Sequence, residues 1–113
     1  MELDKQSTVK TYNNKTYYCP ISLAMDLVGG KWKGVILHYL LSGEKRFSEL
    51  KTIIPEITDM TLSLQLKKLE EDGLITRTVF GDKPPLKVLY RLTPQGERIR
   101  PALEQLCLWA LTL

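Results

Sequence analysis

Few side chains in this sequence could do covalent chemistry. The 113 residues include two cysteines, Cys19 and Cys107, and one histidine, His38. Cys19 is followed by Pro20, which begins a stretch with helical spacing of apolar residues, so its thiol should stand immediately before a helix N-terminus. The partial positive charge at that end of a helix favours a thiolate. Cys19 is therefore a candidate reactive thiol; the alternative is an ordinary, partly buried thiol in an interface between subunits.

The remaining polar residues form no catalytic or metal-binding pattern. His38 has no other imidazole or cysteine at metal-ligand spacing, and we expect it to pack or hydrogen-bond within an apolar helix. Glu70, Glu71 and Asp72 are consecutive and do not form a facing acid–base pair, and no glycine-rich phosphate loop is present. We predict that the protein is not an enzyme and uses no cofactor and no metal ion.

Length and composition predict one globular domain covering residues 1–113. Hydrophobic residues make up 43% and charged residues 26%, close to globular averages. The apolar runs are far shorter than the roughly 20 residues that span a bilayer, and the polar start is not a secretory signal. Two cysteines 88 positions apart do not suggest a disulfide scaffold. We expect a cytoplasmic protein without membrane contact.

The elements that position these residues follow from apolar periodicity and turn signals. Residues 1–18 form a polar N-terminal arm with a turn at Asn13-Asn14 and a short strand. The first two helices are expected over residues 20–28 and about 31–41. A third helix of about two turns is capped by Ser48 and ended by Pro55, and a fourth runs from its cap at Thr58 to Asp72. The last helix is expected from Thr93 to about residue 112, with a kink at Pro101. Between the last two helices the apolar period changes from 3.6 to 2, which predicts a hairpin of 75–80 with 88–92.

This order predicts a helix-turn-helix followed by a wing, in a fold that is mainly α with a small β-hairpin. In the second helix of the motif, Leu62, Leu66 and Leu69 share one face and should pack inward. The opposite face carries Met60, Ser63, Leu64 and Lys67. That face suits the major groove of double-stranded DNA, where hydroxyl, ammonium and apolar groups can each contact base edges. Alternatively, Met60 and Leu64 pack against another subunit or the wing.

Charge distribution adds a weak indication of the same kind. The net charge is +3, with five basic and two acidic side chains in residues 31–51, and six and two in residues 77–100. Residues 58–72 carry two basic and four acidic side chains. Two basic flanks could hold phosphates while the helix between them meets a less charged surface. A solvated surface with no partner explains the charges equally well.

Several ordered motifs carry a family resemblance. The segments CPISLAMDLVGGKWKGVILHYLLSGEKRFSEL, LKKLEEDGLITR and PPLKVLYRLTPQG resemble the HxlR-type family of bacterial winged helix-turn-helix transcriptional regulators, over residues 19 to about 109. The resemblance implies a homodimer built from the arm, the first helix and the last helix, which binds a pseudo-palindromic operator. It also implies that residues 46–92 are the DNA-binding core and wing, and residues 93–113 the dimerisation helix. The apolar residues of the last helix also exceed the needs of one surface stripe.

The resemblance also assigns roles to individual residues. Arg46 and the helix N-terminus at Ser48 should hold phosphates, and Lys83 and Lys87 of the wing should follow the DNA backbone or minor groove. Arg77 either joins them or pairs with an acidic neighbour. The expected base-facing set is Met60, Thr61, Ser63, Leu64 and Lys67, and Thr58 at the helix start is a further expected DNA-binding residue. The expected dimer interface is Leu103, Leu106, Cys107 and Ala110.

Two departures from the family pattern matter. Asp59, Met60 and Leu64 stand where relatives have several polar or basic side chains, so the bound DNA sequence does not follow from the resemblance. Leu86 is an extra residue between Pro85 and Lys87, which predicts a bulge at the root of the wing.

Regulation through a thiol is a further implication of the resemblance. Some members of the family sense oxidants or electrophiles through a cysteine in the Cys-Pro position, which makes Cys19 the redox-sensing candidate. Two other functions remain open: control by a small-molecule effector at the dimer interface, and a winged helix that binds only protein.

Overall fold

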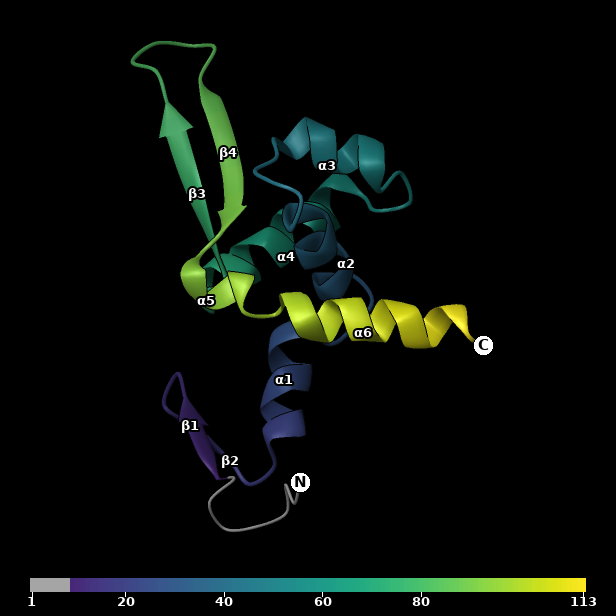
Figure 1. Cartoon of the computed structure of the whole chain (residues 1–113). Coiled ribbons are helices and arrows are strands. Elements are labelled where there is room, and N and C mark those ends of the chain that lie inside the picture. The colour runs from purple at the N-terminus through teal and green to yellow at the C-terminus, as the bar shows by residue number, and fades with distance from the viewer. Residues whose placement is uncertain (1–8) are drawn as a thin grey trace.

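The structure, a computed structural model, describes residues 9–113 and is mainly helical with two short antiparallel hairpins (Figure 1). The elements in chain order are β1 Lys10–Tyr12, β2 Lys15–Tyr17, α1 Pro20–Val28, α2 Lys33–Leu40, α3 Phe47–Ile53, α4 Asp59–Glu71, β3 Ile75–Phe80, β4 Lys87–Leu92, α5 Pro94–Glu97 and α6 Arg100–Leu111. The predicted fold class is confirmed. The first part of the predicted arm, residues 1–8, lies outside the described residues.

The core lies where α2, α3 and α4 meet the β3–β4 hairpin. The side chains with essentially no exposed surface are Ile36, Leu37, Leu50, Ile57, Leu62, Leu66, Leu69 and Ile75. The predicted inward face of α4 is thus confirmed, because all three of its leucines are in this set. Burial of such a face, rather than helix propensity, supplies most of the stability of a short helix.

The helix-turn-helix is closed by local capping contacts, one of which differs from the prediction. Thr58 is the N-cap of α4, as predicted, and its hydroxyl oxygen accepts a hydrogen bond from the Thr61 N–H at 3.1 Å. The sequence predicts Ser48 as the cap of the preceding helix, but α3 begins at Phe47 with Arg46 as its N-cap. The Glu49 carboxylate accepts the Arg46 N–H at 2.8 Å, which satisfies the helix start without the Ser48 hydroxyl.

The expected single helix from Thr93 onward is two helices. Thr93 caps α5, and its hydroxyl oxygen accepts the Gly96 N–H at 2.9 Å. The predicted kink at Pro101 within a continuous helix is wrong, because Pro101 lies in the first turn of α6, where the absence of its N–H does no harm. The chain therefore breaks before Pro101, between α5 and α6.

The wing is a regular hairpin without the predicted bulge. Each residue of β3 pairs with one residue of β4, from Ile75 with Leu92 to Phe80 with Lys87. Leu86 lies in the connection between the strands, which absorbs the extra residue without disturbing the register. The prediction of a bulge at the root of the wing is wrong for this reason.

Two helices extend beyond the core. In Figure 1, α1 points away from α4 toward the β1–β2 hairpin, and the C-terminal half of α6 projects past the other elements. α1 has no buried residue, and Ile21 and Met25 are exposed. Within residues 9–113, no helix has the length and apolar character needed to cross a membrane.

Candidate nucleic-acid interface

The turn between α3 and α4 is held by the core. Ile54 and Ile57 are buried on either side of Pro55 and Glu56, so the turn has little freedom to change the angle between the helices. An antiparallel hairpin, β3–β4, follows α4 directly, and Figure 1 shows it standing beside α3. This arrangement of helix, turn, helix and hairpin defines the winged helix-turn-helix class.

The outward face of α4 is open to solvent in the chain. Met60 is 83% exposed and Leu64 is 49% exposed, and Ser63 and Lys67 are also exposed. Met60 and Leu64 are one helical turn apart, so their side chains lie on the same face. Within one subunit, therefore, no segment among residues 9–113 covers Met60, Ser63, Leu64 or Lys67.

The hydroxyl groups at the start of α4 already have partners. Thr58 donates its hydroxyl to the Thr61 hydroxyl oxygen at 2.9 Å and accepts from the Thr61 N–H. Thr61 is only partly exposed. These two residues fix the helix start and so are less available for base contacts than Ser63 or Lys67.

An ion pair offsets the unfavourable charge of Asp59. Lys51 Nζ lies 3.3 Å from Asp59 Oδ1 and also donates to the Ile57 carbonyl oxygen. Lys51 belongs to α3, so the first helix of the motif neutralises the acidic start of the second. The spacing of the two residues in the sequence does not reveal this compensation, because it depends on the angle between the helices.

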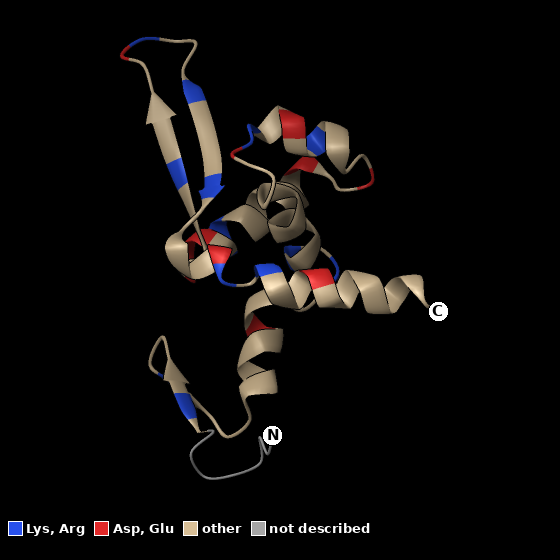
Figure 2. Ribbon diagram, viewed as in Figure 1, with Lys and Arg blue, Asp and Glu red and all other residues tan. Residues whose placement is uncertain are grey.

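Basic residues lie in the wing and at the start of α3, and Figure 2 marks both places in blue on the ribbon. Lys83 lies in the wing connection and Lys87 begins β4, and both are exposed, as are Arg46 and Ser48 at the start of α3. Arg77 in β3 forms no ion pair with another residue in 9–113, so the alternative of an acidic neighbour has no support there.

The two cysteines lie outside this surface. Cys19 is exposed and is the N-cap of α1, without a hydrogen bond from its side chain to the helix start. Cys107 is exposed on α6. It lines a cavity of about 610 Å³ between α2 and α6, together with His38, Tyr39 and Leu108. His38 is exposed rather than packed, because α2 buries the side occupied by Ile36, Leu37 and Leu40.

The predicted interface residues of α6 divide into two groups. Leu103 packs into the chain's own core, whereas Leu106, Cys107 and Ala110 are exposed. The structure also leaves exposed several apolar side chains that are not among the predicted interface residues, namely Leu108, Trp109, Leu111 and Leu113 on or after α6, and Ile21 and Met25 on α1. The absence of any charged residue after Glu104 was the available signal.

Comparison with known proteins assigns the family. The HxlR-like helix-turn-helix family profile matches residues 27–112, and the chain belongs to this family of HTH-type transcriptional regulators. It is 44% identical over 95 residues to YkvN of Bacillus subtilis (strain 168), an uncharacterized HTH-type transcriptional regulator, and the match covers 84% of this chain and 80% of YkvN. The relatives are named as regulators and not as enzymes.

Solved structures show the same fold. The redox regulator HypR in its oxidized form superposes with a TM-score of 0.79 at 40% identity, over 84% of this chain and 97% of HypR. Quinone-bound YodB from Bacillus subtilis superposes with a TM-score of 0.71 at 32% identity, over 84% of this chain and all of YodB.

Proposed function

We propose that the protein is a sequence-specific DNA-binding regulator that acts as a homodimer on a pseudo-palindromic operator. The observation that carries the proposal is the open outward face of α4, framed by the wing and the start of α3. A helix with this exposure enters the major groove, while basic side chains beside it hold phosphates and set its register.

Different residues take different parts in this proposal. Met60 and Leu64 contact thymine methyl groups, and Ser63 and Lys67 hydrogen-bond to base edges. Arg46 and Ser48 at the start of α3, and Lys83 and Lys87 of the wing, contact the DNA backbone. Thr58 and Thr61 keep the first turn of α4 in place through their mutual hydrogen bonds.

The exposed apolar surface of α6 supports the homodimer. Trp109 is 62% exposed and Leu111 is exposed, and neither has a covering segment among residues 9–113. An apolar helix that protrudes from a small domain marks a protein interface. A two-fold axis through this helix would place two α4 helices on successive half-sites, about one or more turns of DNA apart.

The thiol chemistry supports a response to oxidants or electrophiles. The similar protein HypR is a redox regulator, and YodB was solved with a bound quinone. In this chain Cys19 is exposed at the start of α1, so such a reagent has access to its sulfur within one subunit. We propose that oxidation or alkylation of Cys19 weakens operator binding by changing the separation of the two wings.

A second candidate is control by a small molecule. The cavity between α2 and α6 has a volume of about 610 Å³, within the range of small-molecule sites, and lies beside the proposed dimer helix. Such a ligand would act on the same DNA-binding protein and would not require Cys19.

The proposal is tested by selecting duplexes from random DNA with the whole protein, under reduced and diamide-treated conditions. We expect an enriched motif with two-fold symmetry. The logarithm of the affinity for a random duplex should fall with the logarithm of the salt concentration, with a slope of about 0.9 for each neutralised phosphate. Lys67→Ala should weaken operator binding, whereas Lys10→Ala, on β1 away from the wing, should not. Absence of binding to any duplex would favour a protein-binding module.

The role of Cys19 is tested with the same motif. Cys19→Ser should abolish the response of operator binding to diamide or methylglyoxal, and Cys107→Ser serves as the control. An unchanged response in Cys19→Ser would exclude sensing through this residue and leave Cys107 as the responding thiol.

A further inference from the structure

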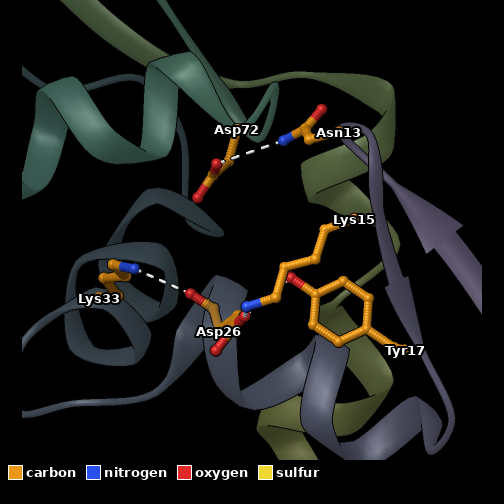
Figure 3. Close-up of polar contacts among 6 residues, drawn as sticks. All are labelled: Asn13, Lys15, Tyr17, Asp26, Lys33 and Asp72. Carbon is orange, nitrogen blue, oxygen red and sulfur yellow. Dashed lines mark hydrogen bonds and ion pairs between the residues drawn. The ribbon is translucent and has the colours of Figure 1, made fainter.

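The β1–β2 hairpin contacts two helices that have different roles. At its turn, Tyr12 Oη donates to the Asp72 carbonyl oxygen at 2.6 Å, and Asn13 Nδ2 lies 3.4 Å from Asp72 Oδ1. Along β2, Tyr17 Oη and Lys15 Nζ both donate to Asp26 Oδ2, at 2.7 Å and 3.1 Å. Figure 3 shows Asn13 pointing toward Asp72, and Lys15 and Tyr17 pointing toward Asp26.

The Asp72 contact closes the C-terminal end of α4. Asp72 is the C-cap of α4, and the last carbonyl groups of a helix have no partner within the helix. The Tyr12 phenol supplies a partner from a residue 60 positions earlier. Gly73 follows with φ of +80°, and a Cβ atom added there would lie 3.6 Å from Tyr12 Oη, so the phenol sits directly against this turn. The hairpin thus adds a contact from a distant segment to the end of α4, which buried Leu69 and Leu74 also hold.

The Asp26 contact fixes the other side of the hairpin to α1. Asp26 lies in α1, and its carbonyl oxygen accepts a hydrogen bond from Lys33 Nζ of α2 at 2.9 Å. Hydrogen bonds from Tyr17 and Lys15 lower the pKa of the Asp26 carboxyl, which keeps this acceptor ionised. The anchor is therefore a charge-assisted contact between β2 and α1.

The hairpin itself has a defined shape but depends on these contacts for its position. Lys10 pairs with Tyr17 and Tyr12 pairs with Lys15, and the turn residues Asn13 and Asn14 have φ of +50° and +64°, as a two-residue type I′ turn requires. An isolated two-stranded hairpin is at best marginally stable in water. Release of either end should therefore free the hairpin from the other helix as well.

We propose that the β1–β2 hairpin is a strut that couples α1 to the C-terminal end of α4, with Tyr12 as a positioning residue for DNA recognition. The inference rests on the proposed function of α4 as the recognition helix. The chain leaves β2 at Tyr17 and enters α1 with Cys19 as the N-cap. A displacement of the start of α1 therefore reaches α4 of the same subunit through the hairpin, without rearranging the leucine core.

The test compares Tyr12→Phe, Tyr17→Phe and the double variant in the whole protein. Each substitution removes one hydroxyl and keeps the ring. Tyr18→Phe is the matched control, because Tyr18 is 80% exposed and its hydroxyl makes no hydrogen bond with a residue in 9–113. The readouts are Kd for the selected operator, Kd for a random duplex, and hydrogen exchange of the backbone amides of residues 72–74.

The strut predicts a specific pattern across these variants. Each single variant should lose about fivefold in operator affinity, the equivalent of one hydrogen bond, with little change on random duplex. The double variant should lose no more than the weaker-binding single variant, because in this proposal the remaining Asn13–Asp72 and Lys15–Asp26 contacts do not hold either end without its tyrosine hydroxyl. Exchange at residues 72–74 should rise in Tyr17→Phe as well as in Tyr12→Phe, and Tyr18→Phe should match the wild type.

Two outcomes overturn the strut. One is operator affinity in Tyr12→Phe equal to that of the control. The other is independence of the two ends, seen as multiplying losses in the double variant or as unchanged exchange at residues 72–74 in Tyr17→Phe. If the wild-type protein binds no duplex, the proposed function fails and the inference fails with it. If every variant binds the operator normally, the inference fails but the proposed function stands.

Discussion

Lys51 of α3 and Asp59 of α4 form an ion pair across the helix-turn-helix, with 3.3 Å between Nζ and Oδ1. The negative charge of Asp59 at the start of α4 is thus compensated by the positive charge of Lys51 on the neighbouring helix. As an exposed contact it contributes little to stability, because Asp59 is largely solvated. Its effect should instead be on the interaction with phosphates, whose charge Asp59 alone would repel.

Lys51→Gln should therefore lower affinity for every duplex several-fold while changing the melting temperature little. The glutamine amide can still donate toward the Ile57 carbonyl, so the principal loss is the positive charge. The double variant Lys51→Gln with Asp59→Asn should recover most of the affinity in a fluorescence anisotropy titration. Failure to recover would mean that Lys51 contacts phosphate directly and that its pairing with Asp59 is incidental.

Leu66→Ala and Leu64→Ala should separate folding from recognition on the same helix. Leu66 is 1% exposed, so its truncation leaves a cavity and should reduce the free energy of unfolding by about 2–5 kcal/mol. Leu64 is half exposed, so its truncation should change stability by about 0.5 kcal/mol or less. Urea unfolding measures both values. Leu64→Ala should nevertheless weaken operator binding, and equal operator affinity would remove Leu64 from the DNA contact surface.

Replacement of thymine by uracil in the selected operator tests the apolar contacts from the DNA side. The substitution removes only the C5-methyl group that Met60 and Leu64 are proposed to touch. Affinity of the wild type should fall several-fold at the contacted positions, and Leu64→Ala should respond less to the same change. Equal affinity at every substituted position would show that neither side chain reads a thymine methyl.

Trp109→Glu should convert the proposed dimer into a monomer. Trp109 is exposed in the chain, so the charge should be tolerated in the folded subunit but not in an apolar interface. Sedimentation velocity at micromolar concentration measures the change, and Gln105→Glu adds the same charge to a more polar part of α6 as the control. A dimeric Trp109→Glu protein would place the subunit contact elsewhere.

The attachment of the β1–β2 hairpin should be insensitive to pH between about 5 and 9. Hydrogen bonds from Tyr17 and Lys15, and the nearby charge of Lys33, lower the pKa of the Asp26 carboxyl. The contribution of Asp26 to stability is therefore present above the ordinary carboxyl pKa of about 4 and is lost as the pH falls through the lower pKa of the folded state. Asp26 raises the pKa of Lys15 and Tyr17, while Asp72 also faces Tyr17.

The contributions of Lys15 and Tyr17 are therefore complete below about pH 10, their ordinary range, and are lost as the pH rises through the raised values. NMR signals of the Tyr17 ring should show no transition between pH 5 and 9. A transition near neutral pH would contradict the Asp26 anchor. Tyr18 provides the reference ring.

Sequence and structure determined different parts of this protein. The inward leucines of α4, the alternation of the wing strands and the caps at Thr58 and Thr93 followed from the sequence, because each depends on residues within a few positions of one another. The ordered motifs also indicated the family, and the family profile confirmed it. Three features differed from the prediction: the start of α3, the division between α5 and α6, and the regular wing. In each case the sequence pattern is compatible with more than one cap residue, helix break or position for the extra residue.

Only the tertiary structure decided the contacts between distant segments. The Tyr12 phenol on the Asp72 carbonyl joins residues 60 positions apart, and nothing in the periodicity of either segment indicates it. The exposure of the C-terminal half of α6 likewise depends on where the core ends. Periodicity determines which face of an element is apolar, but the packing of the whole chain determines what that face meets.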